Sequence, residues 1–346
     1  MSAVRLAMAL SWLMLVVCGE ARAKPLHVAR VTGDGAGLAY WSPAGDSFLV
    51  QSRDGEALVE YRRDGRSVGR ISLEAAHQQL MFDLGGMGEK EMTRPMLSPN
   101  GKTFLLVDGN FTPWRLDVGT GKIAPLDAGR GMVSSMIWLP DGKHAMFSWF
   151  DGSNSRQERI EVASGHVEHS CRSPYRLGAQ LLDDEHVVVL ADQLYAMGFD
   201  CEEPLALTAP DGVARGQAIA VALAPSRHSV AVLLSPSQPT PGSHQGLWIY
   251  ARANRKWTAV RQDAFIASSF AWLDDDTLLF EELRGPDGSD SGTLQRYSIA
   301  AHKVDVAVPP VAGCVESGLS APSRGGVVTF QRLCVREDGW MGMVTR

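Results

Sequence analysis

A short unit built around a tight turn recurs seven times along the chain, and it limits the possible folds more than any other feature. Each copy has an apolar segment ending in Trp or Leu, a turn rich in Pro, Asp and Gly, and a second apolar segment. The clearest copies are Trp41-Ser42-Pro43-Ala44-Gly45, Leu97-Ser98-Pro99-Asn100-Gly101 and Trp138-Leu139-Pro140-Asp141-Gly142. Turns of this composition join antiparallel strands. The sequence therefore predicts an all-β chain of repeated hairpins.

The spacing of the copies sets the architecture. The equivalent positions are Trp41, Leu97, Trp138, Leu181, Leu223, Trp272 and Leu319. They lie roughly 41 to 56 residues apart, which is the period of a four-stranded propeller blade. We therefore predict a seven-bladed β-propeller of four-stranded antiparallel blades, with six blades as the alternative.

A propeller must join its last blade to its first, because an open sheet edge invites association with other chains. The last copy supplies three strands, and residues 26–31 have an apolar alternation that precedes the first copy. We predict that this N-terminal segment is the outer strand of the last blade.

The first 23 residues have the pattern of a secretory signal peptide. Arg5 precedes an apolar run over residues 6–17, and Ala21-Arg22-Ala23 is a small-x-small cleavage site. We expect residues 1–23 to be removed, leaving one propeller domain over residues 24–346 without a transmembrane segment. Lipid anchoring at Cys18 is disfavoured because Val17 is not small. The expected location is the periplasm or the outside of the cell.

Cysteine usage agrees with export. Of the five cysteines, Cys18 lies in the signal peptide, and the remaining four suit an oxidising compartment. Cys314 and Cys334 can face each other across the last blade, which would leave Cys171 with Cys201. Four cysteines allow three connectivities, and the sequence does not choose among them.

Composition and motifs exclude several functions. The net charge is -6, and no basic stripe suits nucleic acid. No Gly-x-Ser-x-Gly elbow, phosphate loop or spaced set of metal ligands is present, so we predict no catalytic residue, metal or cofactor. His144, His186 and His228 follow the repeat turns on separate copies, where solvation of a turn explains them.

Three insertions are the best candidates for binding. They cover residues 77–92, 235–244 and 284–292. In a propeller, connections between second and third strands share one rim with connections between blades, so all three would lie on one face, where binding usually occurs. The candidate binding residues are Gln79, Phe82, Gln238, His244, Asp287 and Asp290.

The turns also carry a family resemblance. The W-S-P-x-G and L-S-P-N-G-K turns, with Leu116-Asp117 and Thr120-Gly121-Lys122 downstream, resemble the WD-like β-propeller repeats of TolB-type proteins. TolB has a further α/β domain before its propeller, whereas the first copy here follows soon after the signal peptide. The resemblance implies a propeller-only relative, and it specifies architecture far better than activity.

Two functions follow as hypotheses. The first is a non-enzymatic, monomeric propeller that binds a protein of the cell envelope through its loop-rich rim. The alternative is an enzyme, such as a lyase, lactonase or hydrolase of carbohydrates or small metabolites, with its site in the axial funnel.

Overall fold

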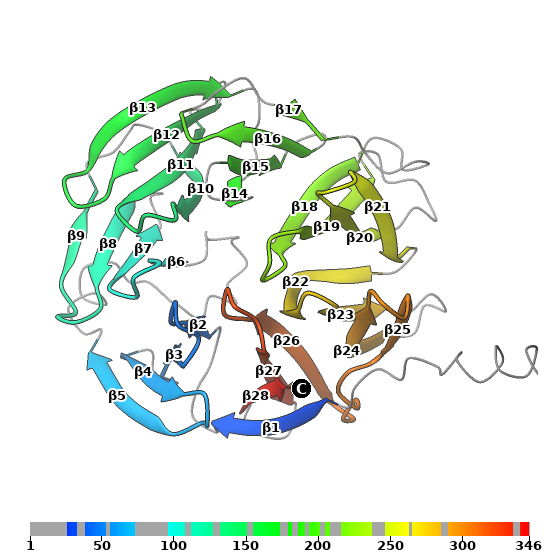
Figure 1. Ribbon diagram of the computed structural model, residues 1–346. Helices are drawn as coiled ribbons and strands as arrows, with labels where there is room; N and C mark the ends of the chain where they lie inside the picture. Colours follow the sequence, from blue (N-terminus) through cyan, green and yellow to red (C-terminus); the bar gives the residue numbers. More distant parts are fainter. Residues whose placement is uncertain are drawn as a thin grey trace, which may run out of the picture.

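The seven copies of the repeat form seven antiparallel sheets. In the computed structural model, each sheet has four strands and the sheets are arranged in a ring (Figure 1). The prediction of a β-propeller with four-stranded blades is confirmed, with seven sheets rather than six. The structure describes residues 26–32, 39–52, 56–72, 96–107, 112–126, 132–150, 155–173, 179–181, 186–190, 194–200, 205–207, 216–236, 246–262, 265–284, 290–334 and 340–345.

The first four blades each use four consecutive strands, from the axis outward. Blade one contains β2 (Tyr40–Trp41), β3 (Ser47–Gln51), β4 (Ala57–Arg62) and β5 (Ser67–Ser72). Blade two contains β6 (Met96–Leu97), β7 (Thr103–Val107), β8 (Pro113–Asp117) and β9 (Ile123–Pro125). Blade three contains β10 (Met132–Trp138), β11 (His144–Phe150), β12 (Ser155–Glu161) and β13 (His166–Ser173). Blade four contains β14 (Ala179–Leu181), β15 (His186–Leu190), β16 (Leu194–Gly198) and β17 (Leu205–Ala206).

The last three blades continue this plan, and only the last takes a strand from elsewhere in the chain. Blade five contains β18 (Gly216–Leu223), β19 (Ser229–Pro236), β20 (Gly246–Ala251) and β21 (Lys256–Arg261). Blade six contains β22 (Phe265–Asp274), β23 (Thr277–Arg284), β24 (Asp290–Ser298) and β25 (Lys303–Val306). Blade seven contains β26 (Cys314–Ser320), β27 (Val327–Cys334), β28 (Trp340–Thr345) and β1 (His27–Thr32).

The N-terminal strand closes the ring. Strand β1 pairs antiparallel with β28, with Val28 opposite Val344, and it forms the outer edge of blade seven. In Figure 1 it lies beside the C-terminal strands, at the outer edge of the blade. The prediction for this segment is confirmed. Across the seam with blade one, the hydroxyl of Ser320 donates a hydrogen bond to the Ala39 carbonyl at 2.7 Å.

The repeat turns join the first and second strands of their blades. Gly45, Gly101 and Gly142 have φ angles of 71°, 72° and 65°, which glycine adopts without steric cost. Two of the repeat tryptophans form hydrogen bonds between neighbouring blades. The indole of Trp138 donates to the Met96 carbonyl at 3.0 Å, and that of Trp272 donates to the Ala222 carbonyl at 2.9 Å.

The core lies between the blades. Seven clusters of buried apolar side chains are present among the described residues, one between each pair of neighbouring blades. The cluster between blades seven and one joins Trp41 and Phe48 to Val327 and Met343. Each blade therefore buries its faces only against its two neighbours, which makes the closed ring the unit of stability.

Residues 1–25 lie outside the described residues, and they include the expected signal peptide and Cys18. Within the described ranges, we find no helix with the length and apolarity that a membrane crossing requires.

Candidate functional site

The two rims of the ring carry different strand ends. At one rim the inner strands begin and the second strands end, so the connections from second to third strands, and those from one blade to the next, start and finish there. We call it the loop rim. The three insertions singled out in the sequence all join strand ends of this rim.

Most of the predicted binding residues fall outside the described residues: Gln79, Phe82, Gln238, His244 and Asp287. The exception is Asp290, the first residue of β24, whose backbone lies opposite Arg284 at the end of β23. This register places Asp290 at the loop rim, and its role in binding stays a prediction.

Large apolar side chains that are exposed concentrate at the loop rim. Seven occur among the described residues, and five belong to strand ends or connections of this rim: Met132, Phe265, Leu283, Val306 and Val311. The other two, Val68 and Leu205, lie on the outer strands of blades one and four. Four of the five come from blade six and its connection to blade seven. We call Phe265, Leu283, Val306 and Val311 the apolar rim group.

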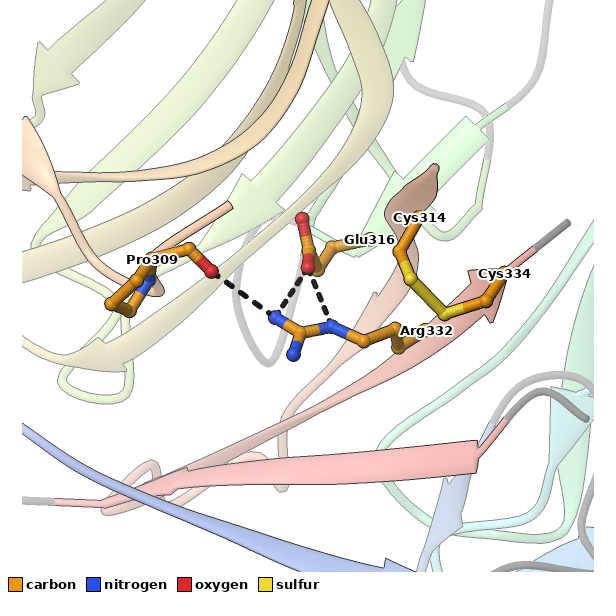
Figure 2. The surroundings of a disulfide bond; sticks show 5 residues. All are labelled: Pro309, Cys314, Glu316, Arg332 and Cys334. Carbon is orange, nitrogen blue, oxygen red and sulfur yellow. Dashed lines mark hydrogen bonds and ion pairs between the residues drawn. A yellow bond between two sulfur atoms is a disulfide. The ribbon is translucent and has the colours of Figure 1, made fainter. Parts of the chain in front are cut away.

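A buried ion pair lies in blade seven near the same rim. Glu316 in β26 is opposite Arg332 in β27, and the Arg332 Nε donates to Glu316 Oε1 at 2.7 Å. The guanidinium Nη2 also reaches this oxygen at 2.5 Å and donates to the Pro309 carbonyl at 3.4 Å. Figure 2 shows the pair beside the Cys314–Cys334 disulfide. Glu316 is 1% exposed, and its Oε2 has no hydrogen-bond partner among the described residues.

A second carboxyl group from blade six approaches this pair. Glu281 in β23 is 4% exposed, and it has no hydrogen bond to a described residue. Burial, together with the negative charge of Glu316, raises the pKa of Glu281 to about 7. Near neutral pH this group can therefore gain or lose a proton.

Glu282, the next residue of β23, points to the opposite face of the blade. Glu282 is also buried, and it accepts hydrogen bonds from Arg261 Nε at 2.9 Å and Nη2 at 2.7 Å. Arg261 ends the outer strand of blade five, so this pair links blades five and six. Successive residues of a strand point to opposite faces, so Glu281 and Glu282 contact different neighbours.

Blade three contains another buried polar group near the loop rim. The hydroxyl of Ser135 donates to that of Ser148 at 3.0 Å, and Ser148 donates to the side-chain carbonyl of Gln157 at 2.7 Å. Alongside, Arg156 Nε lies 2.9 Å from Glu158 Oε1. Burial raises the pKa of Glu158, although the charge of Arg156 opposes the shift. These contacts lie within the blade, and the second carboxylate oxygen of Glu158 has no hydrogen-bond partner among the described residues.

Away from the loop rim, one histidine differs from its expected role. The sequence predicted that His144 solvates a turn. In the structure its Nδ1 lies 2.5 Å from Asp141 Oδ2 and its Nε2 lies 3.0 Å from Glu168 Oε1. Arg159 Nε lies 3.0 Å from the other oxygen of Glu168. The imidazole therefore joins the repeat turn to the outer strand of blade three.

The cysteines follow the blade plan where they are described. Cys314 and Cys334 face each other in register across β26 and β27 and form a disulfide. Cys171 in β13 is also disulfide-bonded. Cys201, its expected partner, lies outside the described residues.

Sequence reasoning did not identify Glu281, Glu316 or Arg332. The available signal was a charged residue placed late in the second strand or early in the inner strand, as in Leu278-Leu279-Phe280-Glu281. In several other blades these strand positions hold apolar residues that pack in the core, so a charged residue there is unusual. Within the described ranges, no group of three or more His, Cys, Asp or Glu side chains is arranged to hold a metal ion.

Comparison by sequence finds no protein-family model that matches the chain and no curated protein that matches it. Solved structures do share its fold. An oligogalacturonate lyase from Vibrio parahaemolyticus has a TM-score of 0.61 at 11% identity, covering 92% of this chain and 93% of that one. An oligogalacturonate lyase in complex with manganese has a TM-score of 0.61 at 11% identity, covering 93% and 96%.

A WD40 propeller is equally similar. The WD40 repeats of RRP9 have a TM-score of 0.61 at 11% identity, covering 93% of this chain and 97% of that one. Similarity at this identity shows the fold alone, and the fold occurs both in a lyase and in a WD40-repeat protein. The chain is thus similar to WD-like β-propellers over nearly its whole length.

Proposed function

We propose that this chain is an exported, non-enzymatic β-propeller that binds a protein of the cell envelope through its loop rim. In this proposal it is a propeller-only relative of TolB-type proteins, with one domain over residues 24–346 after removal of residues 1–23. The observation that carries the proposal is the apolar rim group, because exposed apolar side chains concentrated on one rim are typical of protein-binding surfaces.

The sequence of the rim connections indicates the chemistry of the partner. Six of the seven connections between second and third strands contain an aspartate: Asp54, Asp108, Asp151, Asp192, Asp287 and Asp338. The same connections contain only Arg53 and Arg336 as basic residues. Acidic connections of this kind next to exposed apolar side chains favour a partner segment that presents basic residues beside apolar ones.

Export is supported by two independent features. The first 23 residues have the charge and hydrophobicity pattern of a signal peptide. The Cys314–Cys334 disulfide is of the kind that forms and persists in oxidising compartments. We therefore propose the periplasm or the outside of the cell as its location.

The test compares capture of a partner by matched variants. The mature protein is crosslinked in intact cells and purified as wild type, as Phe265→Ser with Leu283→Ser, and as Val68→Ser with Leu205→Ser. The last pair also removes two exposed apolar side chains, but from outer strands away from the loop rim. We expect wild type and this control to capture the same basic protein and the rim variant to lose it. Equal capture by all three would refute the proposal.

The enzymatic alternative is supported by one comparison, since a similar propeller is a lyase whose structure contains manganese. It predicts that the purified protein holds a metal ion at stoichiometry and cleaves an oligosaccharide. Elemental analysis and a lyase assay on the wild-type protein separate this function from rim binding.

A further inference from the structure

Two buried carboxyl groups meet at the seam between blades six and seven, just inside the loop rim. Glu281 comes from the second strand of blade six, and Glu316 comes from the inner strand of blade seven. They are 4% and 1% exposed, and strands β23 and β26 are in contact. The Arg332 guanidinium is bonded to Glu316 (Figure 2).

The strands in most extensive contact with β23 are β22, β24 and β26. Their described charged residues supply no partner to Glu281. The charged residue of β22 is Asp274, at the opposite end of the strand. In β24, Asp290 lies at the rim and Arg296 is bonded to Asp305 at 2.6 Å. In β26 the charged residue is Glu316, and Glu282 beside it in blade six is bonded to Arg261.

The ion pair decides which carboxyl group holds the proton. Burial raises the pKa of both groups, but the charge and hydrogen bond of Arg332 oppose the shift at Glu316. Arg332 therefore stabilises the charged form of Glu316, and a negative charge there adds to the cost of ionising Glu281. A buried charge without a partner is unfavourable, so Glu281 is expected to be neutral when the seam is closed below neutral pH.

We propose that Glu281 is a proton-controlled contact between blades six and seven, closed when its carboxyl group is protonated and loosened when it is ionised. In the protonated state one buried negative charge is balanced by Arg332. In the ionised state the two carboxylates repel each other, and Glu281 gains free energy by moving toward water at the nearby rim.

This contact lies directly under the proposed binding surface. Leu283 follows Glu281 by two residues, and Val311 lies on the connection that leads into β26. Opening of the seam would displace Leu283 and Val311, two of the four side chains of the apolar rim group. Acidic conditions would then favour the closed rim and partner binding, a consequence that rests on the proposed function, whereas the seam contact itself does not.

Hydrogen exchange of the mature protein tests the contact without any partner. Exchange of peptides covering residues 278–284 and 314–319 is measured at about pH 5.5 and about pH 8 and corrected for the intrinsic rate. If opening returns Glu281 to its ordinary pKa, the opening equilibrium of wild type should rise about 30-fold between these pH values. Glu281→Gln should abolish this rise, because the amide stays neutral.

Glu282→Gln is the matched control, since it alters the adjacent buried carboxyl group but leaves Glu281 and Glu316 in place. It should keep the pH dependence of wild type. The proposal is overturned if wild-type exchange in these peptides does not depend on pH after correction, or if Glu281→Gln retains the wild-type dependence.

An infrared titration of the wild-type protein covers the case in which Glu281→Gln fails to fold. A protonated carboxyl band that disappears near pH 7 supports the contact, and its absence at about pH 5.5 overturns it. Partner affinity is then measured at both pH values. If hydrogen exchange at the seam depends on pH but the affinity for the partner does not, only the connection between the seam and partner binding is refuted.

Discussion

Replacement of Gly342 by alanine should destabilise the blade that closes the ring. Gly342 in β28 lies opposite Phe330 in β27, and the Phe330 ring covers the glycine. An alanine Cβ would lie 2.8 Å from Phe330 Cε2 and closer still to Cζ and Cε1. Carbon atoms prefer separations of about 3.5 to 4 Å, so the ring must retreat by roughly 1 Å. Phe330 is fully buried among Leu279, Leu294 and Val344, which leaves it little room.

The magnitude follows from two opposing effects. Overpacking of a core lowers the free energy of unfolding by about 1–3 kcal/mol. The lower backbone entropy of alanine in the unfolded chain offsets about 0.4–1 kcal/mol of this loss. We expect a net loss of about 1.3 kcal/mol in the free energy of unfolding. For a propeller of this length, that loss lowers Tm by about 2 °C.

A double-mutant cycle measured by urea denaturation identifies the cause. Phe330→Leu makes space over Gly342, so the double variant should be more stable than the sum of the single effects by at least about 1 kcal/mol. Gly69→Ala is the control, because its Cβ would be no closer than 3.4 Å to Glu60 in an outer strand. The reasoning is refuted if Gly342→Ala is as stable as wild type, or if the two substitutions are additive.

Three further predictions concern the same blades. Replacing Cys314 and Cys334 together by serine removes a disulfide that joins residues 20 apart. The variant should have a free energy of unfolding about 3 kcal/mol lower than that of the oxidised wild-type protein, as measured by chemical denaturation. Deleting residues 24–32 exposes the edge of β28 and should lower Tm and produce dimers or aggregates in light scattering; an unchanged Tm with a monomeric protein would contradict ring closure. Because the pKa of Glu281 is raised to about 7 from 4.5 in the unfolded chain, its stabilising contribution is complete below about pH 4.5 and is lost as pH rises to about 7. Between about pH 5.5 and about pH 8 wild type should lose about 2 kcal/mol more than Glu281→Gln, and equal losses in urea denaturation would contradict the assignment.

The repeat turns made the architecture predictable because their chemistry is local. A turn such as Ser98-Pro99-Asn100-Gly101 specifies a strand reversal from four adjacent residues, and the spacing of its copies gives the blade period. The closing strand over residues 26–31 was predictable because a ring leaves one edge that only a terminal segment can cover. These features depend on neighbours in sequence or on the requirements of a closed sheet.

The buried charges were not predictable because their partners are distant in sequence. Glu281 and Glu316 lie on different blades, and the spacing of each residue within its strand does not reveal which face meets the other. His144 was interpreted as a solvated turn residue for the same reason. Its contact with Glu168 comes from pairing across the blade, which a pattern of turns does not encode.

A hydrogen-exchange footprint of the protein with its captured partner tests rim binding most directly. If the loop rim binds the partner, protection on complex formation is confined to the strand ends and connections of this rim, centred on Phe265, Leu283 and Val311. The variant with Phe265→Ser and Leu283→Ser should then show no protection at the same partner concentration. Protection at the opposite rim or on the outer strands carrying Val68 and Leu205, with the loop rim unchanged, would contradict the account.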